Sequence, residues 1–241
     1  MSRTILISGA SSGIGAATAQ LFLAEGWTVG LMARRADALA EVAGGHEAAH
    51  ILPGDVTDPD SVASNVAAFA DAAGRIDVLF NNAGLFVPAA PIDETPLDDW
   101  DRAVSVNLTG MFLMARAAFG RMRTQGGGRI INNGSISAHV PRPNAVSYTV
   151  TKHAITGLTR QLSLDGRALG IACGQIDIGN ARTPMLEAVD KSQRDAGGGG
   201  VAMMDVDDAA RSVLHMANLP PEANVLFMTV MANDMPYVGR G

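Results

Sequence analysis

Tyr148 and Lys152 stand four residues apart, with Ser135 upstream of them. If residues 146–168 form a helix, this spacing places the phenol and the ammonium on one face of it. A tyrosine ordinarily titrates near about 10, and a fixed cation beside it stabilises the phenolate. The pair therefore predicts a proton donor or acceptor near neutral pH, acting on an alcohol or a carbonyl group.

A glycine-rich segment follows the first apolar run of the chain. Residues 4–8 read Thr-Ile-Leu-Ile-Ser and lead directly into Gly-Ala-Ser-Ser-Gly-Ile-Gly, ahead of a helical pattern. Without side chains at Gly9, Gly13 and Gly15, a pyrophosphate can approach backbone N–H groups at a helix N-terminus. Glycines at such turns also occur for conformational reasons alone, but the position after the first strand favours nucleotide binding.

Short apolar runs alternate with helical patterns along the whole chain. The expected strands cover residues 4–8, 27–33, 50–55, 76–81, 129–133, 170–178 and 224–231. The expected helices include residues 13–25, 58–73, 96–123 and 146–168. Apolar strands separated by helices imply right-handed crossovers and a sheet covered on both faces. The sequence therefore predicts an α/β fold, a doubly wound parallel sheet of about seven strands.

Composition narrows the class of protein. The 241 residues are 47% hydrophobic and 17% charged, which suits one domain spanning residues 1–241. A net charge of -6 argues against a nucleic-acid partner and leaves a small molecule. The single cysteine, Cys173, excludes an intrachain disulfide and suits a reducing compartment. Because no signal peptide or membrane span is recognised, we expect a cytoplasmic protein with no membrane partner.

Four consecutive glycines occupy positions 197–200. They carry no side chains to pack and lose much backbone entropy on ordering, so we expect a mobile segment at about 184–204. Two interpretations stay open: a tolerated surface loop, or a lid over the substrate crevice.

Taken together, these motifs resemble the short-chain dehydrogenase/reductase family along nearly the whole chain. The 9–15 loop looks like that family's cofactor signature, Asn-Asn-Ala-Gly at 81–84 like its NNAG element, and Asp55-Val56 like its adenine-contacting pair. The resemblance implies a single-domain Rossmann-type oxidoreductase that depends on NAD(P). It implies cofactor contacts from Gly9, Ser11, Ser12, Gly13, Ile14, Gly15, Arg34, Arg35, Asp55, Val56, Asn82, Ala83, Gly84, Tyr148, Lys152, Gly179 and Thr183.

The same resemblance implies four catalytic roles. Tyr148 would transfer the proton, and Ser135 would support the substrate oxygen with a hydrogen bond. Lys152 would lower the pKa of the tyrosine and hold the nicotinamide ribose, while Asn107 would hold a water in a proton relay. Ser137 lies close by, and alternation along an extended segment would aim it to the same side as Ser135.

The end of the second strand bears on the choice of cofactor. An acidic residue there receives the ribose hydroxyls of NAD, whereas arginine accepts the 2′-phosphate of NADP. Here the strand ends in Arg34 and Arg35, and Asp37 is expected inside the following helix. We expect NADP, with NAD possible, because two arginines can grip a phosphate. Ordinary solvated loop charges are the competing interpretation.

Two departures from the family pattern stand out. Ile178 occupies the place of a usual proline, which returns an N–H donor to the backbone and leaves the local loop shape open. The C-terminal segment lacks the family's frequent Val-Asp-Gly-Gly ending. By resemblance, helices 96–123 and 146–168 pair across a symmetric interface, which implies a homotetramer or a homodimer.

The predicted function is hydride transfer between NADP(H) and a carbonyl or secondary alcohol. A dinucleotide-binding sensor or scaffold without turnover is the alternative, and an isomerase or dehydratase is disfavoured by the lack of a second substrate domain. We expect no metal, because no second ligand stands at suitable spacing from His139. The expected pocket wall comprises Phe86, His139, Val140, Pro141, Asn144 and Met185.

Overall fold

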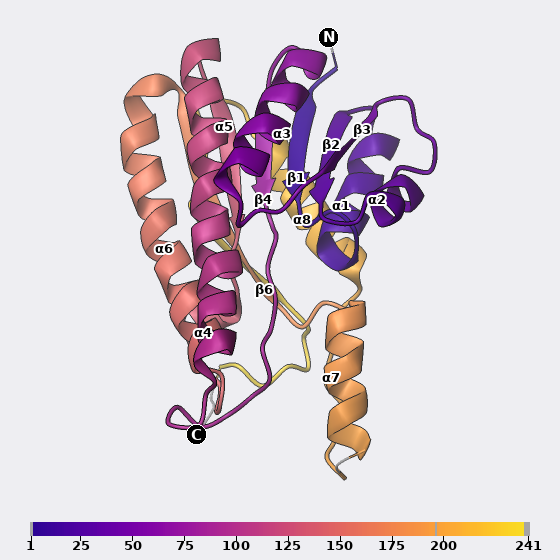
Figure 1. The fold of residues 1–241 in the computed structure, drawn as a ribbon, viewed down its shortest axis with the longest axis vertical. Coiled ribbons are helices and arrows are strands. Elements are labelled where there is room, and N and C mark those ends of the chain that lie inside the picture. Colours follow the sequence, from indigo (N-terminus) through magenta and orange to yellow (C-terminus); the bar gives the residue numbers. More distant parts are fainter. Residues whose placement is uncertain (1, 196, 239–241) are drawn as a thin grey trace.

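A parallel sheet of seven strands forms the centre of the computed structural model, which describes residues 2–195 and 197–238. The strands lie in the order β3-β2-β1-β4-β5-β6-β7 (Figure 1). Their bounds are β1 Thr4–Ser8, β2 Thr28–Ala33, β3 Ala49–Pro53, β4 Val78–Asn81, β5 Gly128–Asn133, β6 Ile171–Gly179 and β7 Phe227–Met231. All six neighbouring pairs are parallel, so the expected doubly wound sheet of about seven strands is confirmed.

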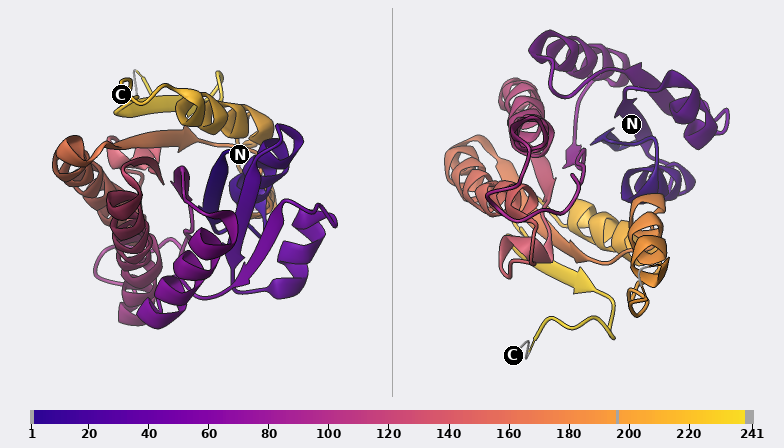
Figure 2. Two further views of the ribbon diagram at one scale, coloured as in Figure 1. Left: turned by 90° about the horizontal axis from the view of Figure 1, so that it is seen from above. Right: turned by 60° about the horizontal axis from the view of Figure 1, so that its bottom comes forward.

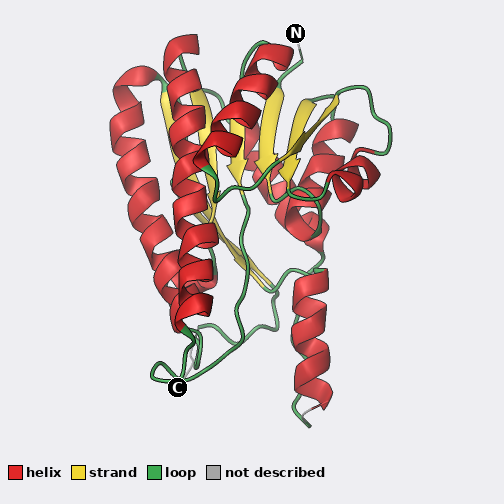
Figure 3. Ribbon diagram, in the orientation of Figure 1, coloured by secondary structure: helices red, strands yellow, loops and turns green. Residues whose placement is uncertain are grey.

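Helices cover both faces of this sheet (Figure 3). Helices α1 and α8 pack together on one face, while α3 and α5 pack together on the other, with α6 beside β6 (Figure 2). The bounds are α1 Gly13–Ala24, α2 Ala36–Ala43, α3 Pro59–Ala73, α4 Leu97–Val104, α5 Met111–Gln125, α6 Val146–Gly166, α7 Pro184–Asp195 and α8 Val206–Asn218.

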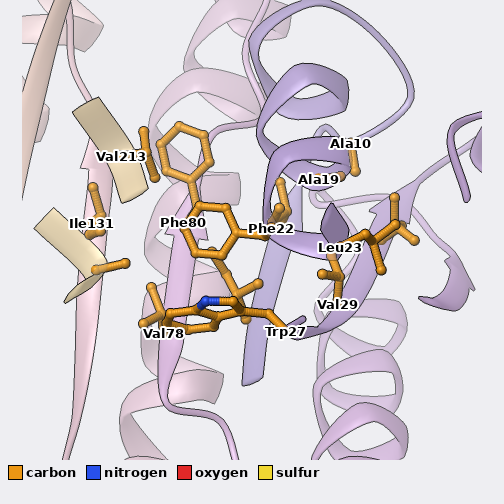
Figure 4. Close-up of a cluster of buried hydrophobic side chains, with 14 of the residues drawn as sticks. Ala10, Ala19, Phe22, Leu23, Trp27, Val29, Val78, Phe80, Ile131 and Val213 are labelled. Carbon is orange, nitrogen blue, oxygen red and sulfur yellow. The ribbon is translucent and has the colours of Figure 1, made fainter. Parts of the chain in front are cut away.

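The central strands are apolar on both sides because helices bury both faces. Every residue of β1 is buried, and so is every residue of β4. On the α1 face, Phe22 and Trp27 meet edge to face with ring centres 4.8 Å apart, close to Phe80 of β4 (Figure 4). This packing fixes α1 against β1 and β4, and therefore fixes the turn that connects β1 to α1.

The strand order places a crevice between β1 and β4. The chain runs from β1 outward to β2 and β3, then returns to β4 and continues outward in the opposite direction. Connections on the two sides diverge at such a switch point, which leaves a crevice at the carboxyl ends of the strands. The motifs of the sequence lie at these ends.

A continuous helical run covers Leu97–Gln125, with a mean hydropathy of 1.2 over its most apolar window. Among the described residues it alone has the length and composition of a membrane span, and 44% of that window is buried inside the protein. It packs against α3 and α6. The core helix of a soluble protein can have the same length and composition.

Residues 184–195 form a helix, whereas the sequence favoured a loop there. Helix α7 extends past the sheet in Figure 1. A parallel bridge between Ala181 and Met204 joins the two ends of the segment that contains this helix. The Asp190 carboxylate accepts a 2.5 Å hydrogen bond from the Val201 backbone, which ties the returning chain to α7. Mobility of 184–204 stays a prediction.

Candidate active site

A cavity of about 400 Å³ opens at the carboxyl ends of the strands, and most predicted site residues line it. Three of them do not: Gly15, Asn107 and Gly179. The structure brings the others together around this one space, namely Gly9, Ser11, Ser12, Gly13, Ile14, Arg34, Arg35, Asp55, Val56, Asn82, Ala83, Gly84, Ser135, Tyr148, Lys152 and Thr183.

The turn between β1 and α1 requires its glycines. Gly9 and Gly13 have φ values of 67° and 54°, in the left-handed region that favours glycine. A Cβ on Gly15 would stand 2.2 Å from the Gly9 carbonyl oxygen, so this residue shapes the turn from behind the cavity. Ser12, the N-cap of α1, makes no side-chain cap. The helix thus presents uncapped N–H groups, which suit a pyrophosphate.

Asn82 fastens this turn to the end of β4. Its side-chain amide donates to the carbonyl oxygens of Ser8 and Gly9, at 3.0 and 3.3 Å. In return, the Ser8 hydroxyl accepts from the backbone N–H groups of Asn82 and Ala83, at 2.9 and 3.0 Å. The NNAG element therefore holds the glycine turn in place, and Asn82 also lines the cavity.

Arg34 and Arg35 line the other end of the cavity, at the end of β2. Both are exposed, and within residues 2–195 and 197–238 neither makes an ion pair. Asp37 lies in the first turn of α2 and does not line the cavity. The charge available to a ligand at this end of the second strand is therefore positive.

Tyr148, Lys152 and Ser135 meet on the opposite side of the cavity. Tyr148 and Lys152 lie one turn apart on α6, and the Lys152 nitrogen is 5.5 Å from the centre of the phenol ring. That nitrogen donates a 2.8 Å hydrogen bond to the Asn133 carbonyl at the end of β5. The expected face of α6 therefore does point into the crevice.

The pKa values depart from the expectation of an acidified phenol. Burial raises the pKa of Tyr148, and a hydrogen bond from Ser135 and the charge of Arg142 oppose this only in part. Burial also lowers the pKa of Lys152 to about 8, against a smaller opposing effect of Asp177. The protein's own groups thus hold the phenol protonated at neutral pH, which suits a proton donor.

Asn107 lies in a π-helical segment, Ser105–Gly110, between α4 and α5. Both polar atoms of its side chain bond to Leu85: the oxygen accepts from the backbone N–H at 2.8 Å and the amide donates to the carbonyl at 2.9 Å. A Cβ on Gly84 would stand 3.4 Å from the Asn107 oxygen and 4.0 Å from the Lys152 nitrogen. Asn107 is thus a neighbour of Lys152, and its part in a water relay stays a prediction.

Asp177 is a buried carboxylate that sequence reasoning missed. It is fully buried on β6 and accepts hydrogen bonds from the backbone N–H of Ser135 at 2.9 Å and the amide of Gln175 at 2.7 Å. The His139 imidazole lies 2.7 Å from its other oxygen. A charged residue inside the apolar run Ile176-Asp-Ile178 was the signal that could have revealed it. Asp177 fixes the backbone that carries the Ser135 hydroxyl.

Several expectations about the pocket wall were wrong. Residues 136–138 form a 3₁₀ turn, not an extended segment, so Ser137 does not share the direction of Ser135 and does not line the cavity. Phe86 and Met185 line the cavity as expected. His139 points to Asp177 from outside and is not part of the lining. Val140, Pro141 and Asn144 are likewise absent from the lining.

The segment after β6 shows what Ile178 does. Strand β6 continues through Ile178 to Gly179, in register with Val230 and Met231 of β7. A proline at Ile178 would lack the N–H donor that this continuous strand can use. Thr183 directly precedes α7, and its hydroxyl accepts a 3.3 Å hydrogen bond from the Leu186 backbone in the first turn of that helix.

Comparison with known proteins agrees with this arrangement. The family model described as short chain dehydrogenase matches residues 3–194. The chain belongs to this family. The predicted membership is thereby confirmed, as is the expectation of an NAD(P)-dependent oxidoreductase at the level of the family.

Individual members of the short-chain dehydrogenase family are similar over much of their length. Serine 3-dehydrogenase from Agrobacterium fabrum (strain C58 / ATCC 33970) is 32% identical, over 99% of this chain and 97% of the relative. Cis-4-hydroxycyclohexanecarboxylate dehydrogenase from Sinomonas cyclohexanicum is 38% identical, over 76% of this chain and 75% of the relative. The crystal structure of 3-ketoacyl-(acyl-carrier-protein) reductase from Brucella melitensis complexed with NADH has a TM-score of 0.86 at 25% identity, covering 96% of this chain and 97% of the other.

The close approach at Gly15 gives a first prediction. Gly15→Ala places a methyl group against the Gly9 carbonyl, so the turn must shift. We expect lower stability in urea unfolding and weaker NADPH binding by fluorescence titration. Gly120→Ala is the control, because nothing lies within 4 Å of its Cβ; there we expect a gain of about 0.5–1 kcal/mol. Unchanged NADPH affinity in Gly15→Ala would contradict this account of the turn.

Lys152 gives a prediction about pH. Since burial lowers its pKa from 10.5 to about 8, the unfolded chain binds more protons than the folded chain between these values. Wild-type stability therefore gains from Lys152 as pH rises through this window, and the cost of the buried charge is fully present below it. Lys152→Met removes the gain.

Between pH 7 and pH 9, we expect the free energy of unfolding of wild type to rise by about 1 kcal/mol relative to Lys152→Met, measured in urea. Lys191→Met, at the exposed Lys191–Asp195 pair, is the control and should follow wild type. A difference between wild type and Lys152→Met that stays constant across these pH values would show that Lys152 does not titrate there.

Proposed function

We propose that this protein interconverts a ketone or aldehyde and the matching alcohol with NADP(H). The observation that carries the proposal is the joint lining of one cavity by the glycine turn and by Tyr148, Lys152 and Ser135. The relatives named above support the reaction class, because they are dehydrogenases and a reductase. Both dehydrogenases are named for alcohols that also carry a carboxylate.

The fit of a dinucleotide rests on the turn after β1. Gly9 leaves no room for a side chain, because a Cβ there would stand 2.8 Å from the Ala83 backbone. The pyrophosphate would meet the uncapped N-terminus of α1, and Asp55 and Val56 line the region proposed for the adenine. When bound, the reduced nicotinamide supplies a hydride to the carbonyl carbon.

The chain's residues account for the proton in this proposal. Hydride addition develops negative charge on the substrate oxygen, which Ser135 would stabilise with its hydroxyl. Tyr148 would then give its phenolic proton to that oxygen. Because burial raises the pKa of Tyr148, the phenol carries the required proton at neutral pH. Lys152, one turn away, would stabilise the phenolate that remains.

The preference for NADP rests on Arg34 and Arg35. Both are free of ion pairs within the described chain and line the cavity beside the end of β2. Their guanidinium groups would meet the 2′-phosphate of NADP with charge-assisted hydrogen bonds. NAD remains compatible with the site, and the similar Brucella reductase is complexed with NADH.

The setting and assembly of the enzyme are also proposals. We infer a cytoplasmic enzyme, as the single buried cysteine suits a reducing compartment. Exposed apolar side chains on the outer helices, Phe112 of α5 and Val150 and Leu164 of α6, support a homodimer or homotetramer built through these helices. A binding protein without turnover is not favoured, because Tyr148, Lys152 and Ser135, the residues proposed for proton transfer, all line the cavity.

Tyr148→Phe tests the reaction. Loss of the phenolic proton should lower kcat for NADPH-dependent carbonyl reduction by about 10²- to 10⁴-fold, with NADPH affinity nearly unchanged. Tyr237→Phe is the matched control, because Tyr237 packs near Met235 away from the cavity. A Tyr148→Phe enzyme with the wild-type rate would refute the proposed proton transfer.

Arg34→Ala and Arg35→Ala test the cofactor. Removing a charged donor to phosphate should weaken NADPH binding about 10-fold or more and leave NADH binding nearly unchanged. Fluorescence titration of both cofactors measures this, with Arg102→Ala on α4 as a remote control. Equal affinity of wild type for NADPH and NADH would defeat the NADP assignment.

A further inference from the structure

An arginine that sequence reasoning did not single out stands at the reaction end of the cavity. Arg142 lines the cavity together with Tyr148, Ser135 and Phe86. It belongs to the loop that connects the end of β5 to α6, immediately before the helix that carries the proposed proton donor. Its position therefore allows contact with a substrate, not with the adenosine part of a dinucleotide.

The loop holds the backbone of Arg142 in place. Pro141 and Pro143 flank it, so the proline rings restrict the backbone on both sides. Asn144, with a positive φ of 58°, ends the turn, and its carbonyl accepts a 3.1 Å hydrogen bond from the Ala90 backbone. A loop with such a fixed backbone loses less entropy when one of its side chains binds a ligand.

Aromatic rings connect Arg142 to the phenol. The guanidinium carbon lies 5.9 Å from the centre of the Phe86 ring, within the range of a cation–π contact. The Phe86 ring in turn lies 4.3 Å from the ring of Tyr148. The charge of Arg142 also acts on Tyr148 directly, since it opposes the rise in the pKa of the phenol.

Arg142 has no anionic partner within the described chain, where its one ring contact is Phe86. The carboxylate that lines the cavity, Asp55, belongs to the opposite end, beside Val56. The nearby Asp177 is buried behind Ser135 and already accepts bonds from several donors. The reaction end of the cavity therefore carries an unpaired guanidinium and a positive charge at Lys152, with no lining acid to balance them.

We propose that Arg142 binds a carboxylate of the substrate, so that the protein acts on oxo acids and the matching hydroxy acids. A guanidinium offers paired N–H donors that match the two oxygens of a carboxylate. The inference rests on the proposed function, as it names the substrate class of the same site. A neutral ketone would leave the guanidinium unpaired beside the reacting carbonyl.

Kinetics on matched pairs of substrates test the inference. The pairs are acetoacetate, levulinate and 5-oxohexanoate, each against its methyl ester, so that only the charge and the added methyl group differ. Wild type should prefer at least one acid over its ester in kcat/KM. Arg142→Met should reduce kcat/KM for that acid by about 10- to 100-fold and leave the ester within about threefold. Arg142→Lys keeps the charge but not the paired donors, so its kcat/KM for the acid should lie between those of wild type and Arg142→Met.

Arg123→Met is the matched control. Arg123 also stands over a phenylalanine ring, Phe119 at 5.5 Å, but outside the cavity. We expect wild-type kinetics on every pair. The inference would be overturned if the ratio of kcat/KM for acid and ester were the same in wild type and Arg142→Met, or if wild type preferred the esters. Either result would leave the proposed carbonyl reduction standing.

A binding measurement separates this inference from the proposed function. In Tyr148→Phe loaded with NADPH, calorimetry should show acids binding more tightly than their esters, and the additional change Arg142→Met should abolish the difference. If wild type turns over none of the pairs but this Arg142-dependent binding is present, the proposed reaction fails and the carboxylate site stands. If none of the acids is turned over or bound, the carboxylate site is refuted.

Discussion

A chain of hydrogen bonds across the carboxyl edge of the sheet is the constraint on which the site depends. Asn82, at the end of β4, bonds to the glycine turn after β1 and accepts a 2.8 Å hydrogen bond from the Asn133 side chain. The Asn133 carbonyl in turn accepts from Lys152 of α6. Four segments far apart in the sequence are thereby held together, and inside the protein each of these hydrogen bonds is costly to lose. The glycine turn and Tyr148 share one cavity because these bonds connect them.

Asp177 extends this constraint to the serine. A fully buried carboxylate is costly unless donors surround it, and here the donors come from Ser135, Gln175 and His139. A Cβ on Gly134 would stand 2.0 Å from the Asp177 oxygen, so the residue before Ser135 must be glycine for the carboxylate to fit. The strand end, the glycine and the serine thus form one packed unit. Burying this carboxylate costs folding free energy, but it positions the Ser135 hydroxyl beside the Tyr148 phenol.

The sequence was sufficient wherever local spacing decides the geometry. A four-residue separation on α6 aligns Tyr148 with Lys152, and apolar strands alternating with helices imply the sheet whose ends gather the motifs. The sequence was insufficient where the direction of a side chain depends on tertiary packing. The 3₁₀ turn at 136–138 turns Ser137 away, and only the folded chain brings His139 to Asp177 or Arg142 to Phe86. The direction of the Tyr148 pKa shift was likewise hidden, because the extent of burial is a tertiary property.

The charges around Tyr148 connect the proposed proton transfer to the kind of substrate. Burial keeps the phenol protonated, while the positive charge of Arg142 makes loss of that proton easier. A carboxylate bound to Arg142 would neutralise this charge and raise the pKa of the phenol further, so that the proton stays on Tyr148 until charge develops on the substrate oxygen. The same anion would leave Lys152 to stabilise the phenolate afterwards. An acidic substrate would thus secure the donor form of Tyr148 on binding, which links recognition at one end of the pocket to proton delivery at the other.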